Sequence, residues 1–305
     1  MNSAASNPIL IGIDWGTSSL RAFLIGAGGE VLDQVSKSEG IMHVKDGDFE
    51  GSFSSLIGPW VKARGLPVIA SGMITSRNGW VETPYLPLPS GAQELADALV
   101  AHQTSDGTKV IFVTGMTTDH GDVPDVMRGE ETQIIGATAF GISDGVFVLP
   151  GTHSKWIIVR DSQIDDYSTF MTGDIFAALL QHTILGALIE EGPFNLQAFE
   201  MGCAVGLAEG GNLLHDLFGV RTLPLFEKIA GNMVADYLSG LLIGAELQGA
   251  NVASIKDTVT IIGRDDLADR YEVALKAAGL KSKRAPDDIV AKGHFLIAKA
   301  AGLVS

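Results

Sequence analysis

The sequence predicts an α/β protein made of two similar domains. Its 305 residues are about twice the length of an average single domain, which is roughly 150 residues. Two segments, starting near residues 9 and 146, each contain three short apolar runs, and a small glycine-containing turn joins the first two. This is the pattern of a three-stranded meander. A repeat over so long a period indicates a duplicated domain, because solenoid repeats are much shorter.

Helical and strand-like segments alternate after each meander. Short continuous apolar runs predict buried strands, and apolar residues at helical spacing, such as Leu95 and Leu99, predict packed helices. The expected strands are 9–13, 20–25, 30–36, 67–70, 110–114, 146–149, 155–159, 163–170 and 258–262. The expected helices are 91–101, 130–140, 172–189, 195–210, 224–248, 265–278 and 286–302.

Three strands followed by alternating helices and strands, twice over, is the order of two ribonuclease-H-like domains of the actin-like ATPase type. Mixed sheets flanked by helices are therefore expected, with a ligand cleft between the domains. We place the N-terminal domain at 1–140 and the C-terminal domain at 141–285. The last segment, 286–305, is expected to be a helix that packs back on the first domain.

Composition narrows the functional classes. The formal net charge is −15, so a polyanion such as nucleic acid or an acidic membrane surface would be repelled at long range. The first residues lack a basic segment followed by an apolar core, and the longest apolar stretch, 175–189, is shorter than the roughly 20 residues of a membrane span. The single cysteine, Cys203, lies among small apolar residues and is expected to be buried. We expect a cytoplasmic protein whose partners are small molecules.

The two meander turns are candidate phosphate-binding turns. Small residues let backbone amides approach a phosphate closely, and hydroxyl groups add donors. The first turn would use Gly16, Thr17 and Ser18, and the second Gly151, Thr152 and His153. Either turn alone is typical of an ordinary hairpin, but their spacing of one domain favours a shared nucleotide.

Asp14 ends the strand before the first turn, where its carboxylate could hold Mg²⁺; alternatively, it closes the turn by bonding its own backbone. The chain has no Walker sequence, and no Gly-x-Gly-x-x-Gly opens a helix after a strand. The sequence also lacks paired histidines at helical spacing and Cys-x-x-Cys, so zinc is not indicated.

Four blocks carry a family resemblance. They are Asp-Trp-Gly-Thr-Ser-Ser-Leu-Arg (14–21), Ser-Gly-Met-Ile-Thr-Ser-Arg-Asn-Gly-Trp (71–80), Met-Arg-Gly-Glu-Glu-Thr-Gln (127–133) and Leu-Pro-Gly-Thr-His-Ser-Lys-Trp (149–156). The chain resembles the 2-dehydro-3-deoxygalactonokinases, and segments 170–174 and 239–244 extend the likeness. The resemblance implies a Mg²⁺- and ATP-dependent kinase that phosphorylates the 6-hydroxyl of 2-dehydro-3-deoxy-D-galactonate in galactonate breakdown.

The resemblance also implies a catalytic carboxylate. Related glycerol and pentulose kinases carry it in a Gly-Asp-Gln segment, and Gly129-Glu130-Glu131 occupies the matching place here. The replacement of Asp by two Glu residues leaves the assignment open. We choose Glu130 as the base and Glu131 as its alternative, and a solvated acidic helix start would be the non-catalytic explanation.

The resemblance further implies residues that bind the two substrates. Arg77 would grip the substrate carboxylate with two parallel hydrogen bonds, and Asn78 and Trp80 would complete the pocket. Arg128 would neutralise charge on the substrate or on the transferred phosphoryl group, unless it forms a surface salt bridge. Gly263 would let adenosine lie against the backbone, although it also suits a plain strand-to-helix turn.

Two alternatives to this function stay open. The first is another actin-like sugar or sugar-acid kinase, which would keep the phosphate turns but bind a different acceptor. The second is a non-catalytic actin-like nucleotide-binding scaffold, which would need no acceptor pocket. An oligomer is compatible with the sequence but is not indicated by it.

Overall fold

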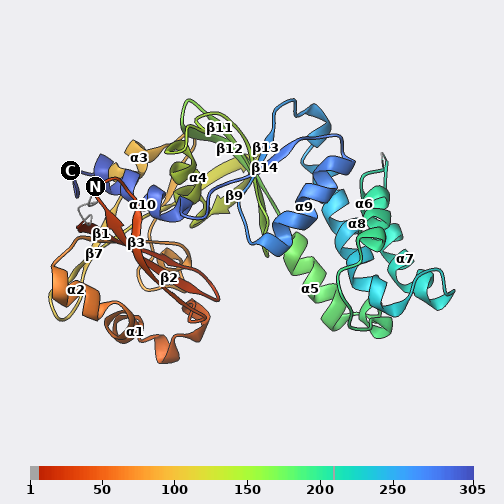
Figure 1. The fold of residues 1–305 in the computed structure, drawn as a ribbon, viewed down its shortest axis with the longest axis horizontal. Coiled ribbons are helices and arrows are strands. Elements are labelled where there is room, and N and C mark those ends of the chain that lie inside the picture. The colour runs from red at the N-terminus through yellow and green to blue at the C-terminus, as the bar shows by residue number, and fades with distance from the viewer. Residues whose placement is uncertain (1–6, 209) are drawn as a thin grey trace, which may run out of the picture. The chain divides into compact units, whose positions relative to one another are not determined.

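The computed structural model describes residues 7–208 and 210–305. The chain divides into two compact units. The first comprises Met1–Asp144, Val159–Asp166 and Pro286–Ser305, and the second comprises Gly145–Ile158 and Tyr167–Ala285. Figure 1 labels the helices and strands of both units.

The first unit contains a six-stranded mixed sheet in the order β3-β2-β1-β4-β7-β6. The strands are β1 (Pro8–Trp15), β2 (Leu20–Gly26), β3 (Val31–Lys37), β4 (Val68–Ser71), β6 (Val100–Gln103) and β7 (Lys109–Phe112). The predicted meander is confirmed, because β2 pairs antiparallel with both β1 and β3. β1 and β4 run parallel, with Asp14 opposite Ser71. This register places the ends of two parallel strands side by side.

Among the described residues of this unit, the α-helices are α1 (Phe49–Leu56), α2 (Gly58–Arg64), α3 (Ala92–Asp97), α4 (Glu130–Thr138) and α10 (Ile289–Ala300). The core gathers apolar side chains of β1, β2, β4 and β7 with those of α1 and of the loop after β4. The C-terminal helix α10 packs mainly on α4 and also contacts α3 and β1.

Glycines allow the backbones of α4 and α10 to touch. A Cβ atom added to Gly136 of α4 would lie 1.8 Å from the carbonyl oxygen of Ile289, and one on Gly293 of α10 would lie 1.9 Å from that of Thr132. Real Cβ atoms do not approach this closely. The contact therefore requires glycine on both helices.

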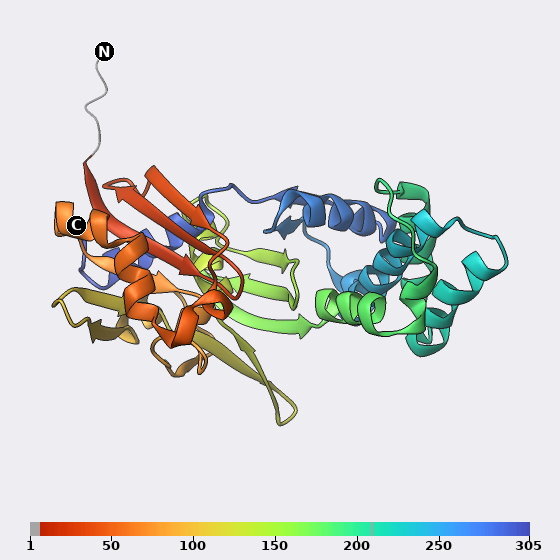
Figure 2. The same cartoon turned by 90° about the horizontal axis from the view of Figure 1, so that it is seen from below.

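A second, three-stranded sheet in the first unit has the order β5-β8-β9. Its strands are β5 (Tyr85–Pro87), β8 (Gly115–His120) and β9 (Val123–Met127). The β8–β9 hairpin extends away from the six-stranded sheet of this unit (Figure 2). The sequence did not predict this sheet, because the hairpin is largely exposed and carries Asp119, Pro124 and Asp125 in place of an apolar run.

A five-stranded sheet in the order β12-β11-β10-β13-β14 lies mainly in the second unit, and the end of its β11–β12 hairpin, Val159–Asp166, is assigned to the first. The strands are β10 (Gly145–Leu149), β11 (Ser154–Arg160), β12 (Gln163–Phe170), β13 (Val259–Ile261) and β14 (Ser282–Arg284). The helices are α5 (Thr172–His182), α6 (Leu196–Gly206), α7 (Leu213–Leu225), α8 (Val234–Gly249) and α9 (Asp265–Ala277). Cys203 is fully buried in this core, as expected. Among the described residues, no helix is long and apolar enough to cross a membrane.

Three helix predictions were wrong in extent. The helix expected at 91–101 ends at Asp97, because 100–103 alternates in burial and pairs as strand β6 with β7. The one expected at 172–189 ends at His182, where Thr183 caps a short 3-10 helix. The one expected at 224–248 begins only at Val234, and Pro224 lies in the last turn of α7.

The α4–α10 contact yields a stability prediction. Gly293→Ala should destabilise the protein by about 1–3 kcal/mol, because the added methyl group forces the two helix backbones apart. Gly219→Ala is the matched control: its Cβ would lie 3.5 Å from the Tyr237 hydroxyl, an ordinary contact, so better helix propensity should leave stability equal or slightly higher. Urea unfolding of both variants measures the difference, and equal midpoints would contradict the contact.

Candidate active site

Three backbone segments converge at the end of β1 in the first unit. Gly72 has a φ of +96°, and a Cβ there would lie 2.8 Å from the carbonyl oxygen of Trp15 and 3.3 Å from a carboxylate oxygen of Asp14. Gly129 has a φ of +112°, and its Cβ would lie 3.1 Å from the Cα of Gly72. Both φ values lie in the region that favours glycine. The glycines therefore bring the start of α4 close to the strand end that carries Asp14.

Asp14 is mostly buried and is held by Arg21 of the neighbouring strand. The guanidinium donates to the carboxylate oxygen Oδ2 from Nη2 at 2.5 Å and from Nε at 3.1 Å. The pair follows from the antiparallel register, which places these two residues opposite each other. The structure thus offers an ion-pair role for Asp14 in addition to the predicted metal role.

The single carboxylate of Asp14 is compatible with the predicted metal role. Within residues 7–208 and 210–305, no group of three or more His, Cys, Asp or Glu side chains could hold a metal ion. Mg²⁺ commonly binds through one or two carboxylates together with the phosphates of a nucleotide. A single carboxylate such as that of Asp14 fits this kind of site and does not fit an all-protein cage.

The first predicted phosphate turn lies directly after β1. The backbone N–H of Gly16 donates to the carbonyl oxygen of Ser19 at 2.9 Å and closes the turn. The N–H groups of Ile41 and Met42 donate to the carbonyl oxygens of Gly16 and Thr17, respectively. The side chains of Thr17, Ser18 and Ser19 are exposed. The carbonyl groups of the turn are therefore held by hydrogen bonds from the backbone of Ile41 and Met42, while its side chains face solvent.

The two acidic residues at the start of α4 lie in different environments. Glu130 is half-buried and accepts the backbone N–H of Arg128 at 2.9 Å. Glu131 is only 1% exposed and accepts the N–H of Gly129 at 2.6 Å and the Thr132 hydroxyl at 3.1 Å. Burial, and then the charge of Glu130, raises the pKa of Glu131 to about 7. Of the pair, Glu130 is the one that a ligand can reach.

Arg128 fixes the loop that follows β4. Its Nη1 donates to the carbonyl oxygen of Thr75 at 2.6 Å and to the hydroxyls of Thr75 and Thr83, and its Nη2 donates to the carbonyl oxygen of Thr83 at 3.0 Å. The guanidinium also lies over the Tyr85 ring. The side chain is buried, so its bonds are internal and are not those of a surface salt bridge. The sequence alone did not indicate this loop-anchoring role.

The remaining predicted acceptor residues belong to the loop that Arg128 anchors. Arg77 is 86% exposed, and its Nε lies 3.3 Å from a carboxylate oxygen of Glu82. Asn78 is exposed as well. Trp80 instead packs in the core of the unit, with its ring 5.4 Å from that of Phe53. Arg77 and Asn78 are thus accessible to a ligand, whereas Trp80 mainly supports the loop.

A buried serine–histidine pair lies at the end of β4. The Ser71 hydroxyl is 2.9 Å from Nε2 of His294, a fully buried residue of α10. Burial, and then the charge of Arg21, lowers the pKa of His294 to about 3, so the imidazole is neutral at physiological pH. No local sequence pattern distinguishes this histidine from the other histidines of the chain. Only the tertiary fold brings it to the strand end beside Asp14.

The second predicted turn joins β10 and β11 in the second unit. It packs on the start of α5: a Cβ on Gly173 would lie 2.4 Å from the carbonyl oxygen of Gly151, and the N–H of Asp174 donates to the carbonyl oxygen of Thr152 at 3.0 Å. His153 is half exposed, and its Nε2 is 3.9 Å from the Asp174 carboxylate. The arrangement couples the turn to the N-terminus of a helix, which suits an anionic group.

The turn forms one wall of a cavity of about 430 Å³ that lies wholly in the second unit. Gly151 and Thr152 line it, and so does Arg264, the neighbour of Gly263. The chain passes close to the turn here, because a Cβ on Gly263 would lie 3.3 Å from Pro150. The cavity thus brings the second turn together with the segment predicted to bind adenosine.

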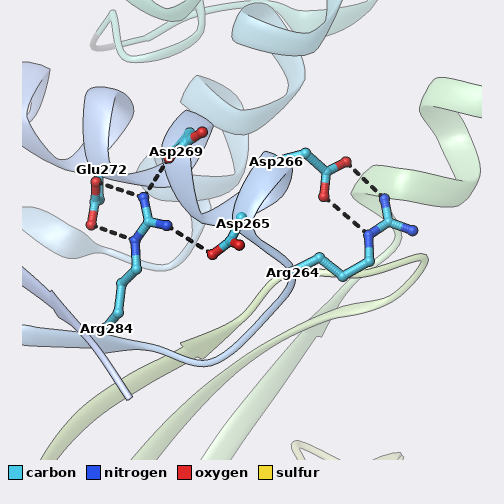
Figure 3. A network of polar contacts seen from close by, with 6 residues as sticks. All are labelled: Arg264, Asp265, Asp266, Asp269, Glu272 and Arg284. Carbon is cyan, nitrogen blue, oxygen red and sulfur yellow. Dashed lines mark hydrogen bonds and ion pairs between the residues drawn. The ribbon is translucent and has the colours of Figure 1, made fainter. Parts of the chain in front are cut away.

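Ion pairs hold the helix that borders this cavity. Arg264 at the start of α9 binds Asp266 through two hydrogen bonds of 2.9 and 3.0 Å (Figure 3). On the outer side of α9, the Arg284 guanidinium of β14 binds three carboxylates, those of Asp265, Asp269 and Glu272 (Figure 3). This network ties α9 to the edge strand of the sheet.

Known proteins match this chain over most of its length. The family model described as 2-keto-3-deoxy-galactonokinase matches residues 14–297. The 2-dehydro-3-deoxygalactonokinase of Escherichia coli is 34% identical over 275 residues, which cover 88% of this chain and 90% of that protein. A crystal structure from Sinorhizobium meliloti, provisionally named a 2-dehydro-3-deoxygalactonokinase, superposes with a TM-score of 0.87 at 33% identity and covers 95% of this chain and 98% of that one.

A more distant structure bears on the fold alone. The activator of the 2-hydroxyisocaproyl-CoA dehydratase from Clostridium difficile, solved with bound ADPNP, is 11% identical with a TM-score of 0.50, over 96% of both chains. The predicted fold class, that of actin-like ATPases and sugar kinases, is confirmed. The family match spans most of the chain, including the two turns, the α4 acidic pair and α10. The chain belongs to the 2-keto-3-deoxy-galactonokinase family, and it is a kinase that phosphorylates an alcohol group.

Proposed function

We propose that this chain transfers the γ-phosphoryl group of ATP to the 6-hydroxyl of 2-dehydro-3-deoxy-D-galactonate, in the cytoplasmic breakdown of galactonate. Family membership supports the reaction and the acceptor. The observation that carries the site is the contact of Gly72 with Gly129, which brings the half-buried Glu130 near the end of the strand that carries Asp14.

The acceptor binds to the first unit in this proposal. Arg77 binds the substrate carboxylate, and Asn78 donates to a substrate hydroxyl, because both side chains are exposed on one anchored loop. Arg128 acts through the loop, since its guanidinium is already bonded to Thr75 and Thr83. Glu130 accepts the proton of the 6-hydroxyl as that oxygen attacks phosphorus.

The nucleotide binds to the cavity of the second unit. Its volume of about 430 Å³ is within the usual range of small-molecule sites, roughly 300–1,000 Å³. The amides of Gly151 and Thr152 serve as phosphate donors in the second unit. In the first unit the Gly16 N–H is already bonded to Ser19, which leaves the Thr17 amide as the candidate donor. Mg²⁺, held by Asp14 and the phosphates, would neutralise charge on the transferred group. Local donors are required because the net charge of −15 repels anions at long range.

A first test concerns the base. Glu130→Gln keeps the shape of the side chain but removes the proton acceptor, so kcat should fall by about 10²–10⁴-fold with little change in either KM. Glu131→Gln is the matched control and should stay within about tenfold of wild type, because the buried amide can still accept the Gly129 N–H. Steady-state kinetics on both substrates measures this. If kcat fell in Glu131→Gln and not in Glu130→Gln, the assignment of Glu130 as the base would be wrong.

A second test concerns the acceptor carboxylate. Arg77→Ala should raise KM for the sugar acid by about 10–100-fold, the range expected for a lost hydrogen bond to a charged group, and leave KM for ATP unchanged. Arg160→Ala removes another exposed arginine, which pairs with Asp165, and should change neither constant. An equal rise in both KM values for Arg77→Ala would indicate a structural loop without a carboxylate clamp.

A third test concerns the metal. Asp14→Asn should lower kcat at least 100-fold and raise the Mg²⁺ concentration that gives half-maximal rate, because the amide is a poorer ligand for the cation. The matched control is Asp33→Asn, which changes an exposed carboxylate on β3 and should behave as wild type. Circular dichroism checks that both variants fold. Activity within a few-fold of wild type would remove Asp14 from the reaction.

A further inference from the structure

A buried carboxylate lies behind the wall of the cavity in the second unit. Glu246 of α8 is only 3% exposed and does not line the cavity, but two of its hydrogen-bond partners, Thr172 and Tyr271, do. Its Oε2 accepts the hydroxyls of Thr172 and of Tyr271, the latter at 2.7 Å. Its Oε1 accepts the indole N–H of Trp156 at 2.8 Å.

In its carboxylate form, Glu246 fixes the direction of the hydrogen bonds in this cluster. The indole N–H of Trp156 can only donate, so Oε1 is an acceptor, and a carboxylate Oε2 accepts from the hydroxyls of Thr172 and Tyr271. Burial raises its pKa, and the hydrogen bonds from Thr172, Tyr271 and Trp156 oppose this rise. Because Tyr271 donates its single hydroxyl proton to Glu246, its oxygen accepts from Ser154, 2.9 Å away.

The same reasoning applies to the threonine in the cavity wall. A hydroxyl has one proton and two acceptor lone pairs, and Thr172 uses its proton on Glu246. The Thr172 oxygen can therefore only accept a further hydrogen bond. A ligand donor, such as a ribose hydroxyl, an amino group of a base or a metal-bound water, is favoured there, whereas a phosphate oxygen would meet a lone pair.

We propose that Glu246 is a positioning residue that orients the Thr172 hydroxyl as a hydrogen-bond acceptor and so sets the affinity of the second unit for a donor group of the nucleotide. This inference rests on the proposed function in that it takes the cavity as the nucleotide site. Glu246 acts through Thr172 and Tyr271 and touches no ligand itself. Its three partner groups come from β11, α5 and α9, so the same carboxylate also joins the elements that surround the cavity.

The experiment compares Glu246→Gln with wild type by titration calorimetry, using a non-hydrolysable ATP analogue without acceptor. The amide has the size of the carboxylate, but its NH₂ group faces the hydroxyls of Thr172 and Tyr271, which must then accept. The Thr172 proton is released toward the cavity, and we expect Kd to rise about tenfold or more. In the kinetic assay, KM for ATP should rise similarly, while KM for the sugar acid should stay within about twofold.

Substitutions of Thr172 separate positioning from a general structural effect. Thr172→Val removes the acceptor and should weaken binding of the analogue to a similar extent, and Thr172→Ser should restore it. In the double variant Glu246→Gln with Thr172→Val, the losses should not add, because one residue acts through the other. Additive losses, or a Thr172→Val variant that binds like wild type, would overturn the proposal.

The outcomes also separate this inference from the proposed function. Unchanged binding in Glu246→Gln, together with normal phosphorylation of the sugar acid by wild type, would refute the inference and leave the function standing. Weakened binding in Glu246→Gln with no phosphorylation by wild type would refute the function and support the inference. If Glu246→Gln does not fold, as judged by circular dichroism, Thr172→Val and Thr172→Ser decide alone.

Discussion

The close backbone approach at the end of β1 is the constraint on which the first unit's site depends. A Cβ at Gly72 would collide with the Trp15 carbonyl, and one at Gly129 would press on Gly72. No other residue type would allow the loop after β4 and the start of α4 to come this close. The approach brings the start of α4, which carries Glu130, close to the end of β1, and the register of β1 with β4 places Ser71 beside Asp14. The geometry of this candidate site is thus a consequence of two glycines.

Each unit also buries a polar group behind its candidate binding surface. In the first unit His294 meets the Ser71 hydroxyl, and in the second Glu246 meets three donors. Burying a polar group destabilises the fold unless the group is hydrogen-bonded. A satisfied buried group therefore holds its hydrogen-bond partners in fixed orientations. The Nδ1 nitrogen of His294 has no partner among the described residues. Because the ring is neutral, burying it destabilises the fold less than burying a charged ring would. Because His294 and Glu246 hold their partners in place, the groups at each candidate binding surface keep a defined geometry.

The sequence predicted the parts of this fold that local patterns encode. The meanders were found because their strands are apolar and their turns contain glycine, and β12 was predicted with the same bounds that the structure shows. Helix ends were less predictable: 100–103 has helical composition but pairs with β7, which only tertiary contact decides. Among the candidate site residues, the pattern could not show that Arg128 is buried or that Glu131 is inaccessible. The partners of His294 and Glu246 are 223 and up to 90 residues away in the sequence, so no local signal could reveal them.

Arginine pairing shows how an acidic chain can present cations to an anionic ligand. Arg21, Arg264 and Arg270 each bind a carboxylate, of Asp14, Asp266 and Asp236, respectively. Such a pair holds the guanidinium in place and cancels its charge. An incoming phosphate or carboxylate must therefore compete with a resident aspartate at these positions, and this competition weakens binding of anions that make no other contact. Arg77 differs, because it makes a single, longer contact with Glu82, at 3.3 Å, whereas Arg264, which is also exposed, holds Asp266 with two hydrogen bonds. Exposed pairs are worth little, so this arginine gives up its partner at the lowest cost. The loop that Arg128 anchors, which carries Arg77, thus holds the most available cation of this group. This fits the proposal that Arg77 binds the substrate carboxylate.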